Sequence, residues 1–283
     1  MKNILLIIYC LSLLSVDGFG QEYRVVDAEN KESLPYATVL FRQTSKGVYA
    51  DRDGVFRIPS NYQLDDTISI SMVGYTSLDI KISDLTDTIF LEKTAYNLQS
   101  IVVTPNKKRK STTVGFISFK KRAKWVQVFS PSKVAVYIKN DTGESQIVDK
   151  LLYRHRQYDK DVRFVVRPQV YTVNEDGAPG DPLLNKAETI MLSGNGILEI
   201  YCEDTLIFPP EGLFVAIELI ETVDDEGLPI TIKEPIGHPF ISTLAARELS
   251  TYISVELVQW TGYLNILRVG DVAINAMFGL SYK

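Results

Sequence analysis

Histidine and cysteine, which often carry catalysis or bind metals, are sparse in this sequence and do not group. The only histidines, His155 and His238, lie in separate segments, and no His-Glu-x-x-His pattern is present. A zinc peptidase site is not supported, because it needs two such histidines one helical turn apart. The sequence also lacks a Gly-x-Ser-x-Gly elbow and a phosphate-binding glycine loop. We therefore predict a non-enzymatic protein without catalytic residues, cofactor or metal.

Two acidic turns are the remaining places where chemistry could occur. Asp51 with Asp53, and the run Asp224 to Glu226, offer the oxygen ligands that Ca²⁺ prefers. Neither has the spacing of a complete calcium loop, so we interpret both as solvated turns. A glycosidase would need two buried carboxylates roughly 5–10 Å apart in a cleft, which a sequence cannot reveal.

Aromatic and basic side chains give the best candidates for ligand binding. Tryptophan and tyrosine rings can stack on sugars, and the segment from Tyr153 to Tyr158 combines arginines with rings. Core packing and a charge-protected strand edge are the alternative interpretations. The candidate binding residues are Trp125, Tyr153, Arg154, Arg156 and Trp260, with Tyr263 a further ring for a sugar platform.

Composition indicates a globular protein that does not target nucleic acid. The formal net charge is −5, with 45% hydrophobic and 23% charged residues. If residues 1–20 are removed, Cys202 is the only cysteine, so cores rather than disulfides must supply stability. The roughly 260 remaining residues suffice for two domains.

The chain between Leu34 and Leu91 has the two-residue period of half-buried strands. Ala37, Val39 and Phe41 alternate with less apolar neighbours, and Ile68, Ile70 and Met72 alternate with serines. The turn Asp51-Arg52-Asp53-Gly54 separates two such stretches, because Gly54 can adopt a positive φ. The pattern predicts a small β-sandwich.

The motifs of this region resemble the carboxypeptidase-regulatory-like domain. They are Leu-Pro-Tyr-Ala-Thr-Val from Leu34, Asp-x-Asp-Gly-x-Phe-x-Ile from Asp51, and Ile-Ser-Ile-Ser-Met-Val-Gly-Tyr from Ile68, followed by Ile89 to Glu92 and Leu98 to Val103. The resemblance implies a transthyretin-like, seven-strand sandwich that is not itself an enzyme. It also implies a link to TonB-dependent outer-membrane receptors, in which such domains stand at the N-terminus. Unlike those receptors, this chain has no pattern for a following barrel.

The ends of this domain show different compositions. Residues 1–20 have a basic start, an apolar stretch of about ten residues and small residues near Gly20, which is typical of a signal peptide. We expect the sandwich over residues 21–93 and a linker over 94–111, which contains the basic run 107–110. That run is interpreted as a solvated tether rather than a lipid-binding site.

Residues 112–283 predict a second β-sandwich or jelly roll. Strand alternation recurs at Val134 to Ile138, Phe164 to Thr172, Val215 to Leu219 and Val272 to Tyr282. Turn signals separate these segments at Gly143, Gly177, Gly194 and Gly227. Only Thr243 to Leu249 has a helical pattern. The order of motifs also resembles a β-sandwich module of secreted and cell-envelope proteins.

The sequence therefore predicts an exported, all-β protein with no transmembrane segment in its mature chain. We expect it in the periplasm or on the outer membrane, as a non-catalytic binding or assembly module with an envelope protein or glycan as partner. The main alternative is a carbohydrate-binding accessory protein of an outer-membrane nutrient-uptake system. A hidden peptidase or glycosidase is a third possibility.

Overall fold

The computed structural model describes residues 21–94, 111–117, 124–128, 130–156, 161–184, 188–202, 206–230, 240–246, 248–257, 260–262, 268–269 and 272–283. Within these ranges every regular element is a β-strand, apart from one short 3-10 helix, Ile82–Asp84 (η1). The all-β prediction is confirmed. No helix in the described ranges is long and apolar enough to cross a bilayer. The predicted signal peptide and nearly all of the predicted linker fall outside these ranges.

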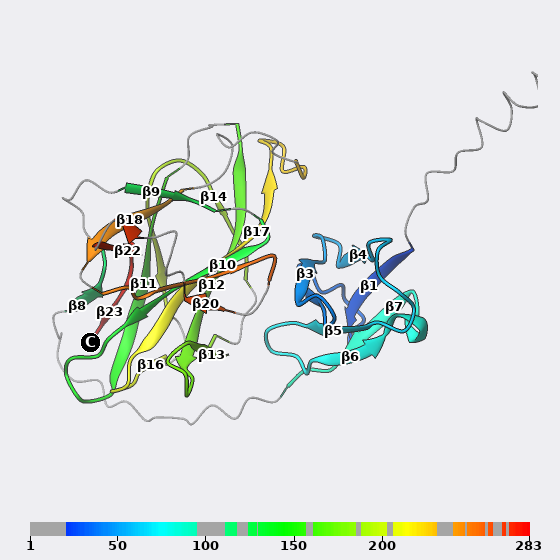
Figure 1. Ribbon diagram of the computed structural model, residues 1–283, viewed down its shortest axis with the longest axis horizontal. Helices are drawn as coiled ribbons and strands as arrows, with labels where there is room; N and C mark the ends of the chain where they lie inside the picture. The colour runs from blue at the N-terminus through cyan, green and yellow to red at the C-terminus, as the bar shows by residue number, and fades with distance from the viewer. Residues whose placement is uncertain are drawn as a thin grey trace, which may run out of the picture.

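Figure 1 shows the strands in two groups, which we call the N-terminal unit (residues 21–94) and the C-terminal unit (described residues from 111 onward). The N-terminal unit has seven strands in two sheets, as predicted. The three-stranded sheet has the order β4 (Val55–Arg57), β1 (Glu22–Asp27), β7 (Thr88–Leu91). The four-stranded sheet has the order β3 (Lys46–Tyr49), β2 (Thr38–Phe41), β5 (Thr67–Ser71), β6 (Leu78–Lys81).

The predicted alternation places one core between these two sheets. Ala37, Val39 and Phe41 are buried, as are Ile68 and Ile70 on the neighbouring strand. Because β2 and β5 pair with Val39 opposite Ile70, their apolar side chains lie on the same face of the sheet. This register fixes the core of the N-terminal unit.

The C-terminal unit also consists of two sheets. The seven-stranded sheet contains β13 (Pro179–Pro182), β12 (Arg163–Val173), β17 (Leu213–Val223), β10 (Ser132–Ile138), β19 (Thr251–Val255) and β20 (Thr261–Gly262) in that order, with β14 (Ile190–Leu192) beside β12. The nine-stranded sheet contains β21 (Arg268–Val269), β22 (Val272–Ala276), β18 (Phe240–Ala246), β11 (Gln146–Arg156), β23 (Phe278–Tyr282) and β8 (Thr112–Gly115) in that order. Beside that path, β15 (Gly196–Tyr201) and β16 (Ile207–Phe208) pair with β11, and β9 (Lys124–Gln127) pairs with β18.

Apolar residues from both of these sheets enclose the largest core. Val134 and Val136 of β10, Val215 of β17 and Leu280 of β23 are buried in it. From Ile274 onward the alternate residues of the predicted C-terminal run also face this core, although a bend at Met277 divides the run into β22 and β23. The predicted turns are confirmed by positive φ angles at Gly143, Gly177, Gly194 and Gly227.

The helix predicted over Thr243 to Leu249 is wrong. Residues Phe240–Ala246 form β18, in which Thr243 pairs with Ala276 of β22 on one side and with Lys124 of β9 on the other. The helix-forming residues of this segment set only a weak local preference. Strand pairing on both sides satisfies the backbone and outweighs it.

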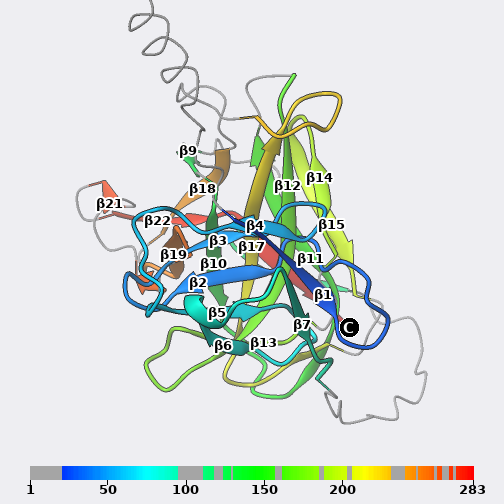
Figure 2. The same ribbon diagram turned by 90° about the vertical axis from the view of Figure 1, so that its right-hand side faces the viewer.

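The seven-stranded sheet carries buried side chains on both faces. Its outer face, turned away from the large core, carries Ala135 and Phe214 under Trp260, and Ile220 and Val223 under tyrosines of the N-terminal unit. Figure 2 looks from the side of the N-terminal unit, whose blue and cyan strands lie in front of the green and yellow strands of this sheet. The two units therefore meet at the outer face of the seven-stranded sheet.

Candidate functional site

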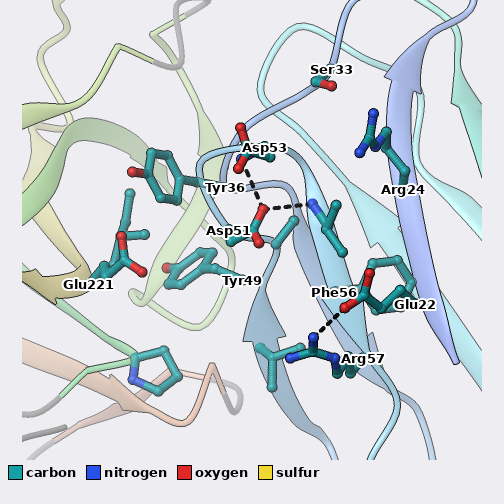
Figure 3. Close-up of a pocket in the computed structure, with 15 residues that line it drawn as sticks. Glu22, Arg24, Ser33, Tyr36, Tyr49, Asp51, Asp53, Phe56, Arg57 and Glu221 are labelled. Carbon is teal, nitrogen blue, oxygen red and sulfur yellow. Dashed lines mark hydrogen bonds and ion pairs between the residues drawn. The ribbon is translucent and has the colours of Figure 1, made fainter. Parts of the chain in front are cut away.

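A cleft of about 680 Å³ lies where the two units meet (Figure 3). The N-terminal unit contributes the outward side chains of β1 and β4, the turn between β3 and β4, and two tyrosines. The C-terminal unit contributes Pro131, Ile220 and Glu221. The side chains used below are Glu22, Arg24, Tyr36, Tyr49, Asp51, Asp53 and Arg57.

The turn at the centre of the cleft is held by its own sequence. Oδ1 of Asp51 accepts hydrogen bonds from the backbone N–H groups of Asp53 (2.9 Å) and Val55 (2.9 Å). Gly54 has φ 75°, and a Cβ there would lie 2.9 Å from the carbonyl oxygen of Val25. The Asp-x-Asp-Gly pattern thus fixes the turn, as the sequence indicated, and leaves the carboxylate of Asp53 exposed.

The opposite wall of the cleft is formed by Tyr36, Tyr49 and Glu221. Tyr36 has a left-handed φ of 59°, and its N–H donates to the carbonyl of Asp51 over 3.1 Å. Burial, together with the nearby carboxylate of Glu221, raises the pKa of the Tyr36 phenol. Burial also raises the pKa of Glu221, and Asp51 reinforces this while Arg52 opposes it. Glu221 is therefore a half-buried carboxylate that faces a second carboxylate.

A buried ion cluster lies behind this wall. Arg167 of β12 and Lys133 of β10 stand directly opposite Glu218 of β17 in neighbouring strands. Nη1 of Arg167 lies 3.2 Å from Oε2 of Glu218, and Nζ of Lys133 lies 3.0 Å from Oε1. The Tyr171 hydroxyl donates to Oε1 over 2.9 Å. Burial disfavours the ionised form of Glu218, but Lys133 and Arg167 outweigh it and hold its pKa below the ordinary value.

The ion cluster reaches across to the N-terminal unit. Nη2 of Arg167 donates to the backbone carbonyl of Tyr36 over 2.9 Å, and the Tyr49 hydroxyl donates to Glu218 over 3.4 Å. The guanidinium also lies 5.8 Å from the centre of the Tyr49 ring. Nε of Arg167 has no hydrogen-bond partner among the described residues. The same side chains therefore neutralise the buried charge and fix the wall of the cleft.

A second junction lies at the edge of the N-terminal unit. The N–H of Gly47 in β3 donates to the carbonyl of Glu256 over 2.7 Å, and Lys46 forms an ion pair with the Glu256 carboxylate at 2.7 Å. Glu256 and Leu257 both have left-handed φ angles, which turn the chain toward β3. A Cβ on Gly47 would lie 2.8 Å from the carbonyl oxygen of Val39 and 3.1 Å from Cβ of Leu257. Glycine is thus needed for this close approach.

The structure does not bring the five predicted binding residues together in one site. Tyr153 is only 1% exposed and packs edge-on against Phe278 in the large core. Its neighbours Arg154 and Arg156 lie on β11, in the nine-stranded sheet, and Nη1 of Arg154 lies 3.7 Å from the sulfur of Met277.

The two tryptophans lie at different sheets: Trp125 in a strand of the nine-stranded sheet, and Trp260 beside the seven-stranded one. Trp260 packs edge-on against Tyr171 beside the seven-stranded sheet. Trp125 belongs to β9, where its backbone pairs with Ser242, while Tyr263 lies outside the described residues. Tyr153 and Trp260 therefore do not lie together, and ligand binding by the candidate residues stays a prediction.

The acidic turn at Asp224 is held by the same kind of hydrogen bonds as the turn at Asp51, from backbone N–H groups to an aspartate side chain. Oδ1 of Asp224 accepts the N–H groups of Glu226 and Leu228, so this carboxylate organises its own loop. In the described part of the chain, no three or more His, Cys, Asp or Glu side chains group so that they could hold a metal ion. His155 is largely buried, which lowers its pKa, and a backbone contact with Gly194 opposes that shift.

Sequence reasoning missed the ion cluster and the Glu221 wall. Charged residues on the polar face of an alternating strand normally point into solvent, so Arg167, Glu218 and Glu221 gave no separate signal. One signal was available: Arg167 and Glu218 each stand between apolar residues in a strand. Only the pairing register, however, places Arg167 and Lys133 on either side of Glu218.

Comparisons with known proteins bear on the N-terminal unit alone. Residues 24–103 match the family model of the CarboxypepD_reg-like domain, which is a regulatory, Ig-like class rather than a catalytic one. The predicted resemblance is confirmed. No curated protein matches the chain.

Among solved structures, the chain is similar to one from the "Structure of infectious bursal disease virus Gt strain", with 10% identity and a TM-score of 0.25. The similarity covers 87% of this chain and 54% of the viral one, so this chain spans about half the length of that protein. A similarity this low indicates neither a shared fold nor a shared function.

Proposed function

We propose that this protein is a non-catalytic binding or assembly module of the cell envelope, and that its binding site is the cleft between the two units. The observation that carries the proposal is the pair of bonds from Arg167 to Tyr36 and from Tyr49 to Glu218. These bonds fix walls from both units in one geometry, and a pre-formed concave site is what binding proteins require.

Export to the envelope belongs to the proposal. The basic, apolar and small-residue pattern of residues 1–20 supports it. The family resemblance of residues 24–103 also favours it, because that resemblance implies a link to outer-membrane receptors. Fractionation of cells that express the tagged full chain tests this part. We expect the protein in periplasmic or outer-membrane fractions, and recovery in the cytosol would contradict it.

Site-specific photo-crosslinking tests the binding role. A photo-reactive amino acid in place of Arg24, which lines the cleft, should give an adduct with an envelope component in intact cells. The same amino acid in place of Glu175, in an exposed turn outside the cleft, serves as the matched control and should not give that adduct. Absence of adducts from Arg24, or equal adducts from both positions, would reject the cleft as the binding site.

A carbohydrate-binding accessory role is the second candidate. It is favoured by the mixture of phenols, carboxylates and guanidinium groups in the cleft, since such groups offer donors and acceptors to sugar hydroxyls. Glycan-array binding that disappears in Tyr36→Phe would support this role. Silence across diverse glycans would count against it.

A further inference from the structure

The charges that line the cleft do not balance. Four carboxylates (Glu22, Asp51, Asp53 and Glu221) face two guanidinium groups, those of Arg24 and Arg57. Glu22 is paired with Arg57. Asp51 uses one oxygen within its own turn. Asp53 and Glu221 have no ion-pair partner among the described residues.

The unbalanced carboxylates lie around two aromatic rings. Figure 3 shows Tyr36 and Tyr49 between Glu221 on one side and the turn with Asp51 and Asp53 on the other. Arg52, in the same turn, donates to the carbonyl of Gly227 over 3.5 Å, so this contact directs its guanidinium to a backbone oxygen. Carboxylates and phenol rings around one space are the groups that attract an ammonium or guanidinium ion.

We propose that the cleft binds a basic peptide segment and takes a lysine or arginine side chain between Glu221 and the Asp51–Asp53 turn. This inference rests on the proposed binding role and names the class of its ligand. A volume of about 680 Å³ accommodates one long side chain with its flanking residues. Arg24 and Arg57, at the outer sheet face of β1 and β4, would donate hydrogen bonds to backbone carbonyl oxygens of the peptide or pair with an acidic neighbour of the inserted residue.

The electrostatics of Glu221 agree with this ligand. Its pKa is raised because it is half-buried and faces Asp51, with Arg52 as the opposing charge. A cation between Glu221 and Asp51 would offset both the burial of the Glu221 charge and its repulsion by Asp51. An anionic ligand would instead add a third negative charge. A neutral ligand would add no positive charge to the opposing effect of Arg52.

The site also depends on contact between the units. Tyr36 and the acidic turn belong to the N-terminal unit, while Ile220 and Glu221 belong to β17. A cationic ligand would contact both units, so its binding should stabilise their contact by mass action. Peptide binding is then expected to raise the thermal midpoint of the full chain.

Fluorescence anisotropy tests the proposal with the full mature chain. The probe is a fluorescein-labelled hexapeptide with three lysines, and its partner probe has glutamine in place of each lysine. We expect the lysine peptide alone to bind, with weaker binding at 0.5 M NaCl because surface-accessible charge pairs are screened. Glu221→Gln and Asp53→Asn should each weaken binding about tenfold, as loss of a charged hydrogen-bond partner does. Glu175→Gln is the matched control and should have no effect.

Several outcomes would overturn the proposal. These are equal binding of both peptides, no binding of the lysine peptide, or unchanged binding in both Glu221→Gln and Asp53→Asn while circular dichroism shows intact folds. Displacement of the probe by a neutral oligosaccharide, with no preference for lysine over glutamine, would assign the cleft to sugars instead.

The crosslinking experiment separates this inference from the proposed function. If the Arg24 position forms its adduct equally well in the Glu221→Gln background, the cleft binds a partner but not through a basic side chain. If the adduct is absent in the wild-type background as well, both the binding role and the ligand class fail.

Discussion

One ion pair from each unit shows how differently the same charges can be placed. In the N-terminal unit, the pair of Arg42 and Asp79 lies on the surface, 2.9 Å apart with side chains 50% and 57% exposed. In the C-terminal unit, Arg167 and Glu218 lie 3.2 Å apart with side chains 2% and 3% exposed. The difference arises because the N-terminal unit covers the outer face of the seven-stranded sheet and removes these charges from water.

This contrast shows what fixes the relative position of the units. An exposed pair gains little, because water and salt screen it. A buried pair need not add net stability, but each partner becomes indispensable to the other, since a lone buried charge is strongly unfavourable. The buried cluster therefore favours the arrangement in which Tyr36 and Tyr49 complete the hydrogen bonds of Arg167 and Glu218.

The largest expected effect is that of Glu218→Ala. This change leaves the buried Arg167 and the partly buried Lys133 without their counter-charge, and it removes the acceptor of Tyr171. We expect the free energy of unfolding to fall by about 3–5 kcal/mol in urea titrations followed by circular dichroism. The crosslink from Arg24 should be lost as well.

Asp79→Ala is the matched control, because it breaks a pair of similar length on the surface of the N-terminal unit. We expect Asp79→Ala to lower the free energy of unfolding by about 0–1 kcal/mol. If Glu218→Ala and Asp79→Ala lowered the free energy of unfolding equally, water would have to reach Glu218 at the outer face of the seven-stranded sheet. The two ion pairs would then not differ in environment.

The contrast also explains how far the sequence could predict the fold. Where one face of a strand points to solvent, as at Ala37, Val39 and Phe41, alternation identifies the buried side chains directly. In β12 and β17 both faces are covered, so Arg167 and Glu218 follow the same alternation but are not exposed. The pattern shows that two faces differ in polarity. It does not show whether another part of the chain covers the polar face.

The candidate site was predictable only in its local parts. The turn at Asp51 to Gly54 follows from residues adjacent in sequence, and its geometry is as expected. The cleft, in contrast, joins Tyr36 to Glu221, 185 positions further along the chain. Pairing of distant strands and contact between the units create that neighbourhood, and no spacing in the sequence records it.

A smaller loss of stability than that of Glu218→Ala is expected at the part of the outer face of the seven-stranded sheet that Trp260 covers. Trp260 packs edge-on against Tyr171 with ring centres 5.4 Å apart, over a cluster that includes Phe214. Trp260→Ala should lower the free energy of unfolding by about 2–3 kcal/mol, less than for a fully buried tryptophan because this ring is partly exposed. Urea titration measures the change.

Trp260→Phe is the control for Trp260→Ala, since it keeps an aromatic ring against Tyr171 and should recover most of the loss. If Trp260→Ala instead left stability unchanged and abolished binding to glycans, Trp260 would be a ligand-binding residue. This part of the outer face of the seven-stranded sheet would then serve ligand binding rather than core packing.

The smallest expected loss of stability is in the N-terminal unit, and it depends on pH. Asp27 is buried at the end of β1, where its carboxylate lies 2.9 Å from Nζ of Lys93 and accepts the Tyr75 hydroxyl over 2.8 Å. The hydrogen bond with Lys93 is the main cause of a strongly lowered pKa, with backbone N–H groups of Glu29 and Asn30 adding to it and burial opposing it. The contribution of Asp27 to stability is therefore fully present above the unfolded-state pKa of about 3.9 and is lost as the pH falls further.

Asp27→Asn should be less stable than wild type at pH 7, by less than Trp260→Ala, and the difference should shrink steadily below about pH 4 because the wild-type carboxylate then becomes protonated too. Thermal unfolding at a series of pH values measures this. Asp79→Asn is the exposed control, and its difference from wild type should stay small at every pH. A gap between Asp27→Asn and wild type that stayed constant or widened in acid would show that the Asp27 charge does not stabilise the N-terminal unit. Asp27 would then not be comparable with Glu218, the buried carboxylate of the C-terminal unit.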